Sequence, residues 1–363
     1  MSLIERLSDW FWSDSFWLPA GVSFRDLQDR PGFVYAKPLD LLHMPLFALL
    51  FTALRALYEK FVSWRIAAYM RIPSERKYPA NSERLEAAYA VERIPAPAEM
   101  RALAAEVQWA ELRVINWFKR RRNLDRPNLR KKFAEASWRF LFYCFAFSFG
   151  MAILVRAPWF WDNIECWNDY PRQSLWPSVY FYYMIEGGFY LALACSLMND
   201  VRRKDFNEQI VHHCATLFLI VFSYVANFVR VGSLVMAIHD VSDIFLELAK
   251  CFVYAKRRVA DDIFTVFAVV FIVSRIFVYP YCVLHTTAVK SMWLYSPYPG
   301  YYFFNLLLAV LQGLHCFWAY IIIAMAVRMA RVGKLEKDAR SDDYEDTVTD
   351  GEDENSEENK KKN

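Results

Sequence analysis

The chain has 363 residues, of which 56% are hydrophobic and 18% aromatic, and its 43 basic and 40 acidic residues leave a formal net charge of +3. This aromatic content excludes a disordered protein and argues against an ordinary soluble enzyme. Ten glycines exclude a glycine-rich repeat protein, and seven scattered cysteines exclude a disulfide-bonded scaffold.

The N-terminal segment, residues 1–39, mixes aromatic residues such as Trp10, Trp12 and Trp17 with charged ones. It has no continuous apolar stretch of the kind found in a signal peptide. We therefore expect a lumenal segment that is not cleaved, followed by a first apolar helix that acts as its own signal anchor.

Long runs without Asp, Glu, Lys or Arg recur along the chain, and the longest covers residues 291–327. A bilayer core needs roughly 20 apolar residues per helix. The sequence therefore predicts an all-α polytopic membrane protein with about seven transmembrane helices. A buried soluble helix would explain one such segment but not seven. The predicted spans lie near residues 40–59, 138–156, 178–199, 209–229, 231–254, 262–286 and 302–327.

Between the first two spans, residues 66–132 predict a small cytosolic helical domain. Residues 113–132 hold nine basic residues and one acidic residue, and the run 114–123 resembles the recognition helix of a homeodomain. That helix reads adenine with an Asn after its Trp-Phe-x run, but here Arg120 follows Trp117-Phe118-Lys119. We therefore expect a structural or membrane-surface role and no specific DNA binding. A gel shift at physiological salt showing site preference would overturn this expectation.

The loops differ in charge. Residues 200–208 contain Arg202, Arg203 and Lys204, and residues 255–261 are also basic, whereas loops 157–177 and 287–301 are aromatic and poor in basic residues. The positive-inside rule then predicts a lumenal N-terminus and a cytosolic C-terminus. Arg202, Arg203 and Lys204 would either attract the phosphates of a substrate or only set the topology.

Ionisable residues inside the fourth and fifth spans are the strongest sign of chemistry. They are His212 and His213 in the fourth span and His239, Asp240 and Asp243 in the fifth. Such residues are costly in a membrane and generally face a protein interior or a water-filled cavity. Histidine is a natural general base near neutral pH, and a carboxylate can fix its tautomer. A buried polar network and a metal site are the alternatives, and no metal-ligand spacing favours the second.

Other ionisable residues have weaker predictions. Glu186 and Arg275 would pair or contact a substrate, and Glu247 would pair with Lys250. Arg139 would extend toward the membrane surface from the end of its span. His285 and His315, which have no carboxylate neighbours in the sequence, are expected to be structural.

Several of these motifs together resemble the ceramide synthases, multispan proteins of the TLC domain class. The matching residues are Asp200-Val201-Arg202-Arg203-Lys204-Asp205-Phe206, His212-His213, Phe222-Ser223-Tyr224, Asn227, Arg230-Val231-Gly232 and His239-Asp240-x-x-Asp243. The resemblance implies a six-helix TLC catalytic domain over residues 133–331. It also implies transfer of a fatty acyl group from acyl-CoA to the amine of a sphingoid base, without a cofactor. His212, His213, Asp240 and Asp243 would be the catalytic residues, and Arg202, Arg203, Lys204 and Arg275 would contact substrate.

The resemblance carries further expectations. In the family, the short lumenal segment before the last span influences acyl-chain length, and here it is residues 289–300. The run Gly300-Tyr301-Tyr302-Phe303-Phe304-Asn305 resembles that of the long- and very-long-chain branch of the family. Residence in the endoplasmic reticulum, contact with membrane lipids and dimers with itself or related synthases are also expected.

The tail, residues 332–363, is predicted to be disordered and cytosolic, since residues 341–358 hold ten acidic residues and no basic one. Ser341, Thr347 and Thr349 are candidate phosphorylation sites, and an inert solubilising tail is the alternative. Lys360-Lys361-Lys362 near the end resembles a dilysine retrieval signal of the endoplasmic reticulum.

Two other functions compete with the acyltransferase. A lipid-binding or transport protein would use the same polar cavity but release no CoA from its substrates. A membrane-tethered transcriptional regulator would depend on the homeobox-like segment, which lacks the adenine-reading Asn.

Overall fold

The computed structural model describes residues 2–73, 78–125, 128–197, 200 and 205–332. Within these ranges the chain is helical. Its only β interaction there is an isolated bridge between Arg30 and Phe33. The predicted all-α fold is confirmed.

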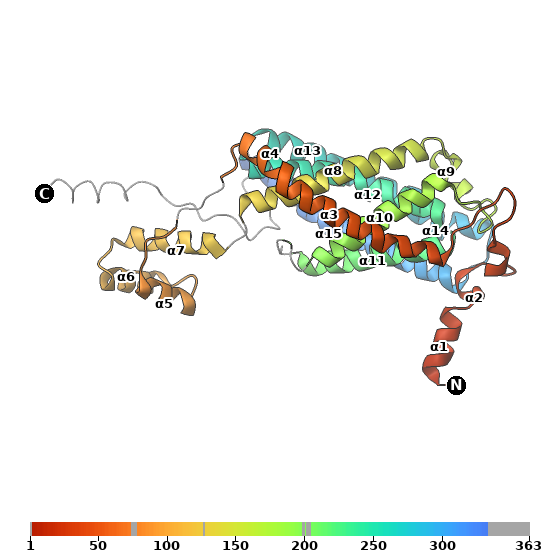
Figure 1. Cartoon of the computed structure of the whole chain (residues 1–363), viewed down its shortest axis with the longest axis horizontal. Coiled ribbons are helices and arrows are strands. Elements are labelled where there is room, and N and C mark those ends of the chain that lie inside the picture. Colours follow the sequence, from red (N-terminus) through yellow and green to blue (C-terminus); the bar gives the residue numbers. More distant parts are fainter. Residues whose placement is uncertain (1, 74–77, 126–127, 198–199, 201–204, 333–363) are drawn as a thin grey trace.

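Long helices form an elongated bundle in which successive members run in opposite directions (Figure 1). The first, α3, continues through the π-helical turn Glu59–Ser63 into α4 (Trp64–Tyr69), ten residues beyond its predicted end. Helix α13 continues through the π-helical stretches Ile272–Val278 and Pro280–Leu284 into α14 (His285–Ala288). The long helices are α3 (His43–Tyr58), α8 (Leu129–Leu154), α10 (Pro177–Ser196), α11 (Phe206–Val225), α12 (Val229–Tyr254), α13 (Val259–Phe271) and α15 (Pro299–Val332).

Five helical segments of the described chain are long and apolar enough to cross a membrane, so the protein is a multi-pass membrane protein. They are Pro38–Tyr69, Glu111–Leu154, Phe206–Val225, Val259–Trp293 and Pro299–Arg331. Helices α10 and α12 are not among them. Helix α10 is rich in tyrosine, and α12 carries the charged residues of the predicted site. Because α12 packs along α8 and α13, and α10 along α3, these polar helices lie inside the bundle.

Short connections hold the bundle together at one end. Asn227, between α11 and α12, adopts a positive φ of 52°. Its side-chain amide donates hydrogen bonds to the carbonyls of Pro171 and Gln173, at 2.6 and 2.8 Å. Gly232 lies so close to Tyr183 of α10 that a Cβ there would fall 1.8 Å from the tyrosine oxygen. The Asn227 and Gly232 positions of the sequence motif therefore have structural roles.

The homeobox-like insert consists of α5 (Glu83–Val91), α6 (Pro97–Glu106) and α7 (Glu111–Asp125). It has its own apolar core around Leu85, Leu103 and Trp117, and the Trp117 indole donates to the carbonyl of Ala80 at 2.7 Å. It lies beside one end of the bundle, whereas α2 (Asp14–Trp17), α9 (Pro158–Trp161) and α14 lie at the other end (Figure 1).

Candidate active site

The predicted histidines of α11 and the aspartate of α12 meet at a cavity of about 120 Å³ inside the bundle. His212, His213, Asp243 and Arg275 all line it. A helix in lipid turns its ionisable side chains toward a protein interior, which accounts for the inward position of these four residues. The cavity is also lined by polar residues that the sequence did not single out, among them Gln209, Tyr190 and Trp318.

Asp243 is held by Arg275. The guanidinium donates to the Asp243 carboxylate at 2.7 Å, to the Ser242 hydroxyl at 3.0 Å and to the carbonyl of His239 at 2.9 Å. Arg275 is buried within the π-helical stretch Ile272–Val278. The expected alternative pairing of Arg275 with Glu186 is wrong, because Asp243 takes the guanidinium.

The two adjacent histidines have different surroundings. The His212 ring packs edge-on against Trp318, with centroids 5.5 Å apart, whereas the His213 ring lies 6.2 Å from that of Tyr190. Both side chains are buried, and neither Nδ1 atom has a hydrogen-bond partner among the described residues. Each imidazole thus keeps an uncommitted nitrogen, which a proton-transfer role requires.

Behind His212 lies a second pair of imidazoles. The His239 ring centroid is 6.4 Å from that of His212, and its Nε2 lies 2.9 Å from Nε2 of the fully buried His315. His239 Nδ1 lies 2.7 Å from the carbonyl of Val235 and must donate to it. Because Nε2 of His239 then accepts in the neutral ring, His315 is the donor between the two rings.

Asp240 does not line the cavity. Its side chain is fully buried, as is that of Glu186 on α10, and the two carboxyl groups interact. None of their four oxygens has a hydrogen-bond donor among the described residues. Although three-residue spacing was expected to place Asp240 and Asp243 on one helix face, they have different neighbours. Asp240 lies against Glu186, and Asp243 pairs with Arg275.

A second, apolar pocket of about 40 Å³ adjoins the first. Tyr190 lines both, and His239 separates the apolar pocket from His212. At its far end the rings of Phe228 and Phe304 stack at 4.8 Å, and the Trp17 ring lies 6.0 Å from Phe304. The two pockets thus place a polar and an apolar compartment on either side of the histidines.

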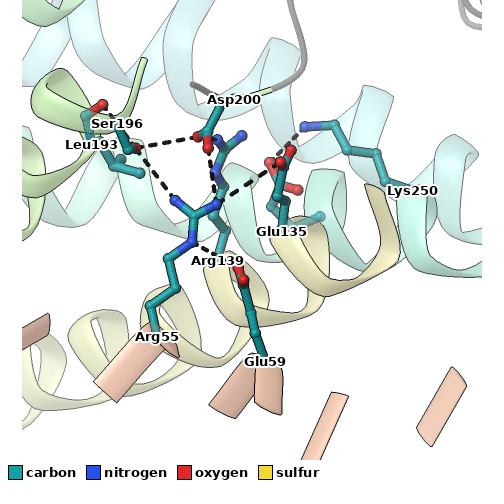
Figure 2. Close-up of polar contacts among 9 residues, drawn as sticks. Arg55, Glu59, Glu135, Arg139, Leu193, Ser196, Asp200 and Lys250 are labelled. Atoms are coloured by element: carbon teal, nitrogen blue, oxygen red, sulfur yellow. Dashed lines mark hydrogen bonds and ion pairs between the residues drawn. The ribbon is translucent and has the colours of Figure 1, made fainter. Parts of the chain in front are cut away.

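Arg139, Asp200 and Lys250 line the polar cavity and lie within a cluster of charged residues (Figure 2). Asp200 accepts hydrogen bonds from Arg55 of α3 at 2.9 Å and from Arg139 of α8 at 2.6 Å. Arg139 is therefore ion-paired near the end of its helix, and its extension toward the membrane surface stays a prediction. Burial alone would raise the pKa of Asp200, but the Arg139 and Arg55 guanidinium groups outweigh it and hold that pKa below its usual range.

The predicted pair of Glu247 and Lys250 is confirmed, with 2.5 Å between the carboxylate and the ammonium group at the cavity wall. Arg202, Arg203 and Lys204 lie outside the described residues, as do Ser341, Thr347 and Thr349. In the described part of the chain, no group of three or more His, Cys, Asp or Glu side chains could hold a metal ion.

Comparison with known proteins extends these observations. A family model described as the TLC domain matches residues 132–324, and the homeodomain model matches residues 76–127. The chain is 41% identical to ceramide synthase 4 of Homo sapiens over 94% of its own length and 87% of that protein's. It is 40% identical to ceramide synthase 4 of Bos taurus (96% and 89%) and to ceramide synthase 5 of Homo sapiens (93% and 88%).

Proposed function

This chain belongs to the ceramide synthase family, and from that premise we propose that its reaction takes place in the polar cavity, at His212, His213 and Asp243. The protein is an acyl-CoA-dependent sphingoid base N-acyltransferase. Its relatives include ceramide synthases 3, 4 and 5, which supports the long- and very-long-chain branch. The single observation that carries the site is the meeting of both histidines with Asp243 in one buried cavity.

The reaction forms a C–N bond between the acyl carbonyl carbon and the sphingoid amine and breaks the C–S bond of the thioester. The attacking amine loses a proton, and the CoA thiolate gains one as it leaves. His212 lies between the polar cavity and the imidazole of His239. It takes the amine proton as a general base, or it first accepts the acyl group on its ring nitrogen and passes it to the amine.

The carboxylates have separate roles in this proposal. Asp243, fixed by Arg275, binds the substrate's ammonium group and orients it toward the histidines. Arg275 contacts the substrate at the cavity wall, which it lines together with Asp243. Asp240 is a positioning residue, because its carboxyl group faces that of Glu186 behind the site, and a proton held between the two joins α12 to α10.

The first methylene groups of the acyl chain enter the apolar pocket beyond His239, and the thioester remains in the polar cavity. Holding two lipid substrates with their reacting atoms in contact removes much of the entropic part of the barrier. The CoA moiety enters from the charged mouth at Arg139 and Asp200, and Arg202, Arg203 and Lys204 attract its phosphates there.

The assignment is tested with purified protein, sphinganine and a long-chain acyl-CoA. His212→Ala and Asp243→Ala are each expected to lower kcat by about 10²–10⁴-fold, the usual contribution of a general acid–base group. The matched control is His285→Ala, because that histidine is exposed and lines neither pocket. Undiminished activity in both cavity variants would overturn the assignment. Trapping an acyl-histidine adduct would distinguish the covalent route from direct attack.

The apolar pocket has its own test. Phe304→Ala removes the stacked ring that closes the pocket, so the variant is expected to favour longer acyl-CoA substrates than the wild type. The measurement is a competition among acyl-CoAs of graded length. Phe317→Ala is the control, since Phe317 lies on the same helix but is exposed. An unchanged chain-length profile would place the acyl chain elsewhere, including along residues 289–300.

The remaining assignments follow the family. We place the protein in the endoplasmic reticulum membrane with the insert and tail in the cytosol, and we expect dimers with itself or related synthases. The insert supports the membrane domain and does not read DNA, because Arg120 stands where a homeodomain has its adenine-reading Asn. A lipid-binding or transport protein remains the competing function, and release of CoA only when both substrates are present excludes it.

A further inference from the structure

The first helix, α1 (Leu3–Phe11), has an apolar face that the described chain covers only at its C-terminal end. At 100° per residue, its five apolar residues fall within an arc of about 120°. The polar residues Glu5, Arg6, Ser8 and Asp9 occupy the rest of the circumference. No residue of α1 is buried. The apolar residues are Leu3, Ile4, Leu7, Trp10 and Phe11.

The exposure of this face is large for a helix outside the spanning segments. Leu3 and Ile4 are 73% and 79% exposed, and Leu7 and Trp10 are each more than half exposed. Leaving such side chains in water forgoes the free energy gained by burying each large apolar residue. The helix is nevertheless well formed, because the Ser2 hydroxyl and the Glu5 carboxylate cap its N-terminus reciprocally. We therefore expect the apolar face of α1 to contact an apolar partner.

The end of α1 is fixed to the bundle. The Phe11 ring packs edge-on against Trp17 at 5.1 Å and against Phe222 of α11 at 5.9 Å. Trp17 in turn stacks on Phe222 at 4.7 Å. From this anchor α1 projects sideways, crosswise to the long axis of the bundle (Figure 1). A helix in that direction runs along a membrane surface and not through it.

Exposed aromatic side chains mark a membrane boundary at the same end of the bundle. Trp161 of α9 is 73% exposed, Trp293 between α14 and α15 is 66% exposed, and Tyr302 at the start of α15 is 63% exposed. Tryptophan and tyrosine favour the headgroup level of a bilayer. Trp10 and Trp12 add the same residue type to α1 and its C-terminal end.

We propose that α1 is an interfacial helix whose apolar face lies in the headgroup region of the membrane that the bundle crosses, at the end opposite the insert. The face joins the bundle where Phe11 packs against Trp17 and Phe222. Glu5 and Asp9 outweigh Arg6 on the polar face, so attraction to anionic lipids contributes nothing. Burial of apolar area alone holds the helix, and zwitterionic lipid suffices.

The test uses the full chain in phosphatidylcholine nanodiscs with photoreactive benzoylphenylalanine at one position. Leu7 and Asp9 are two residues apart but face opposite sides of α1. The proposal predicts severalfold more lipid crosslinking from position 7 than from position 9, unchanged at high salt because the contact is apolar. Equal yields at the two positions would overturn it, as would crosslinking of position 7 to protein in place of lipid.

A second measurement guards against a variant that fails to fold. A nitroxide is attached to a cysteine placed at position 7 or 9, after the seven native cysteines are replaced. Collisions with oxygen are expected to dominate at position 7, and collisions with a water-soluble nickel complex at position 9. The same accessibility at both positions would show that α1 does not lie on lipid.

Discussion

Arg275 and Asp243 form the buried ion pair on which the polar side of the cavity depends, with side-chain exposures of only 4% and 17%. A buried charge that loses its partner is strongly destabilising, whereas loss of both charges can be nearly neutral. Arg275 also donates to the Ser242 hydroxyl and the His239 carbonyl, so it contacts three positions within one turn of α12. In the proposed mechanism its role is therefore to hold Asp243 in place.

Arg275→Gln is expected to lower the free energy of unfolding by about 3–5 kcal/mol, because it leaves the Asp243 carboxylate buried without a cation. Arg275→Gln combined with Asp243→Asn should regain most of that stability while remaining inactive. Thermal unfolding in detergent and N-acylation assays on the same preparations measure both effects. A double variant less stable than Arg275→Gln alone would contradict the role assigned to the pair. Ser242→Ala, which removes a single hydrogen bond, is the control for a general packing defect.

Residues close in sequence could be paired from the sequence, and residues on distant helices could not. The Glu247–Lys250 pair follows from three-residue helical spacing, and both histidines and Asp243 follow from the cost of charge in a membrane. Arg139 and Arg55 meet Asp200 across 61 and 145 residues of sequence, and no local pattern predicts such a contact. The environment of Asp240 was missed for the same reason, because Glu186 approaches it from another helix.

At the scale of the elements, Arg55, Arg139 and Asp200 tie α3 and α8 to the end of α10 at the mouth of the cavity (Figure 2). Arg55 also bonds Glu59, in the π-helical turn that leads toward the insert. The sequence predicted the ends of α10 within three residues, but α8 begins at Leu129, nine residues before its predicted start. It missed the continuation of α3 into α4, because charged residues there are typical of a span end.

The pKa of Asp200 lies below its usual range, so its ion pairs stabilise the fold above the unfolded pKa of about 3.9 and lose that effect as pH falls through the lower folded value. We expect Asp200→Asn to lower Tm at neutral pH, and the gap between wild type and variant to narrow at acid pH. Thermal unfolding across a pH series measures this. Glu92→Gln is the matched control, since Glu92 is an exposed carboxylate of the insert and its variant should show no such gap. A gap that widens at low pH would contradict the argument.

At the scale of the whole molecule, the alternating helices place the described N-terminal segment and the end of α15 at opposite ends of the bundle (Figure 1). The insert, the end of α10, the start of α11 and the connection from α12 to α13 lie at the end of the bundle where α15 finishes. These are the segments whose charge predicted a cytosolic location. The near-zero net charge of the chain is thus a balance between basic segments at this end and the acidic residues of the tail.

The sequence has no Asn-x-Ser/Thr site, which makes glycosylation mapping free of background. A sequon-bearing tag placed before Met1 is expected to be glycosylated in cells, and the same tag after Asn363 is not, because the basic segments hold their end of the bundle in the cytosol. A mobility shift removed by an endoglycosidase is the measurement. Modification of the C-terminal tag alone would reverse the orientation, and modification of both tags would indicate an even number of spans.

Under the proposed function, the stacked rings of Phe228 and Phe304 close the far side of the apolar pocket, which leaves the acyl chain one way in. The acyl chain must enter such a pocket before the sphingoid base binds at its entrance, and the amide product must leave by the same route. Substrate binding would then be ordered, with acyl-CoA first and the sphingoid base second. In steady-state kinetics, sphingoid base at high concentration would then bind the free enzyme and inhibit competitively with respect to acyl-CoA.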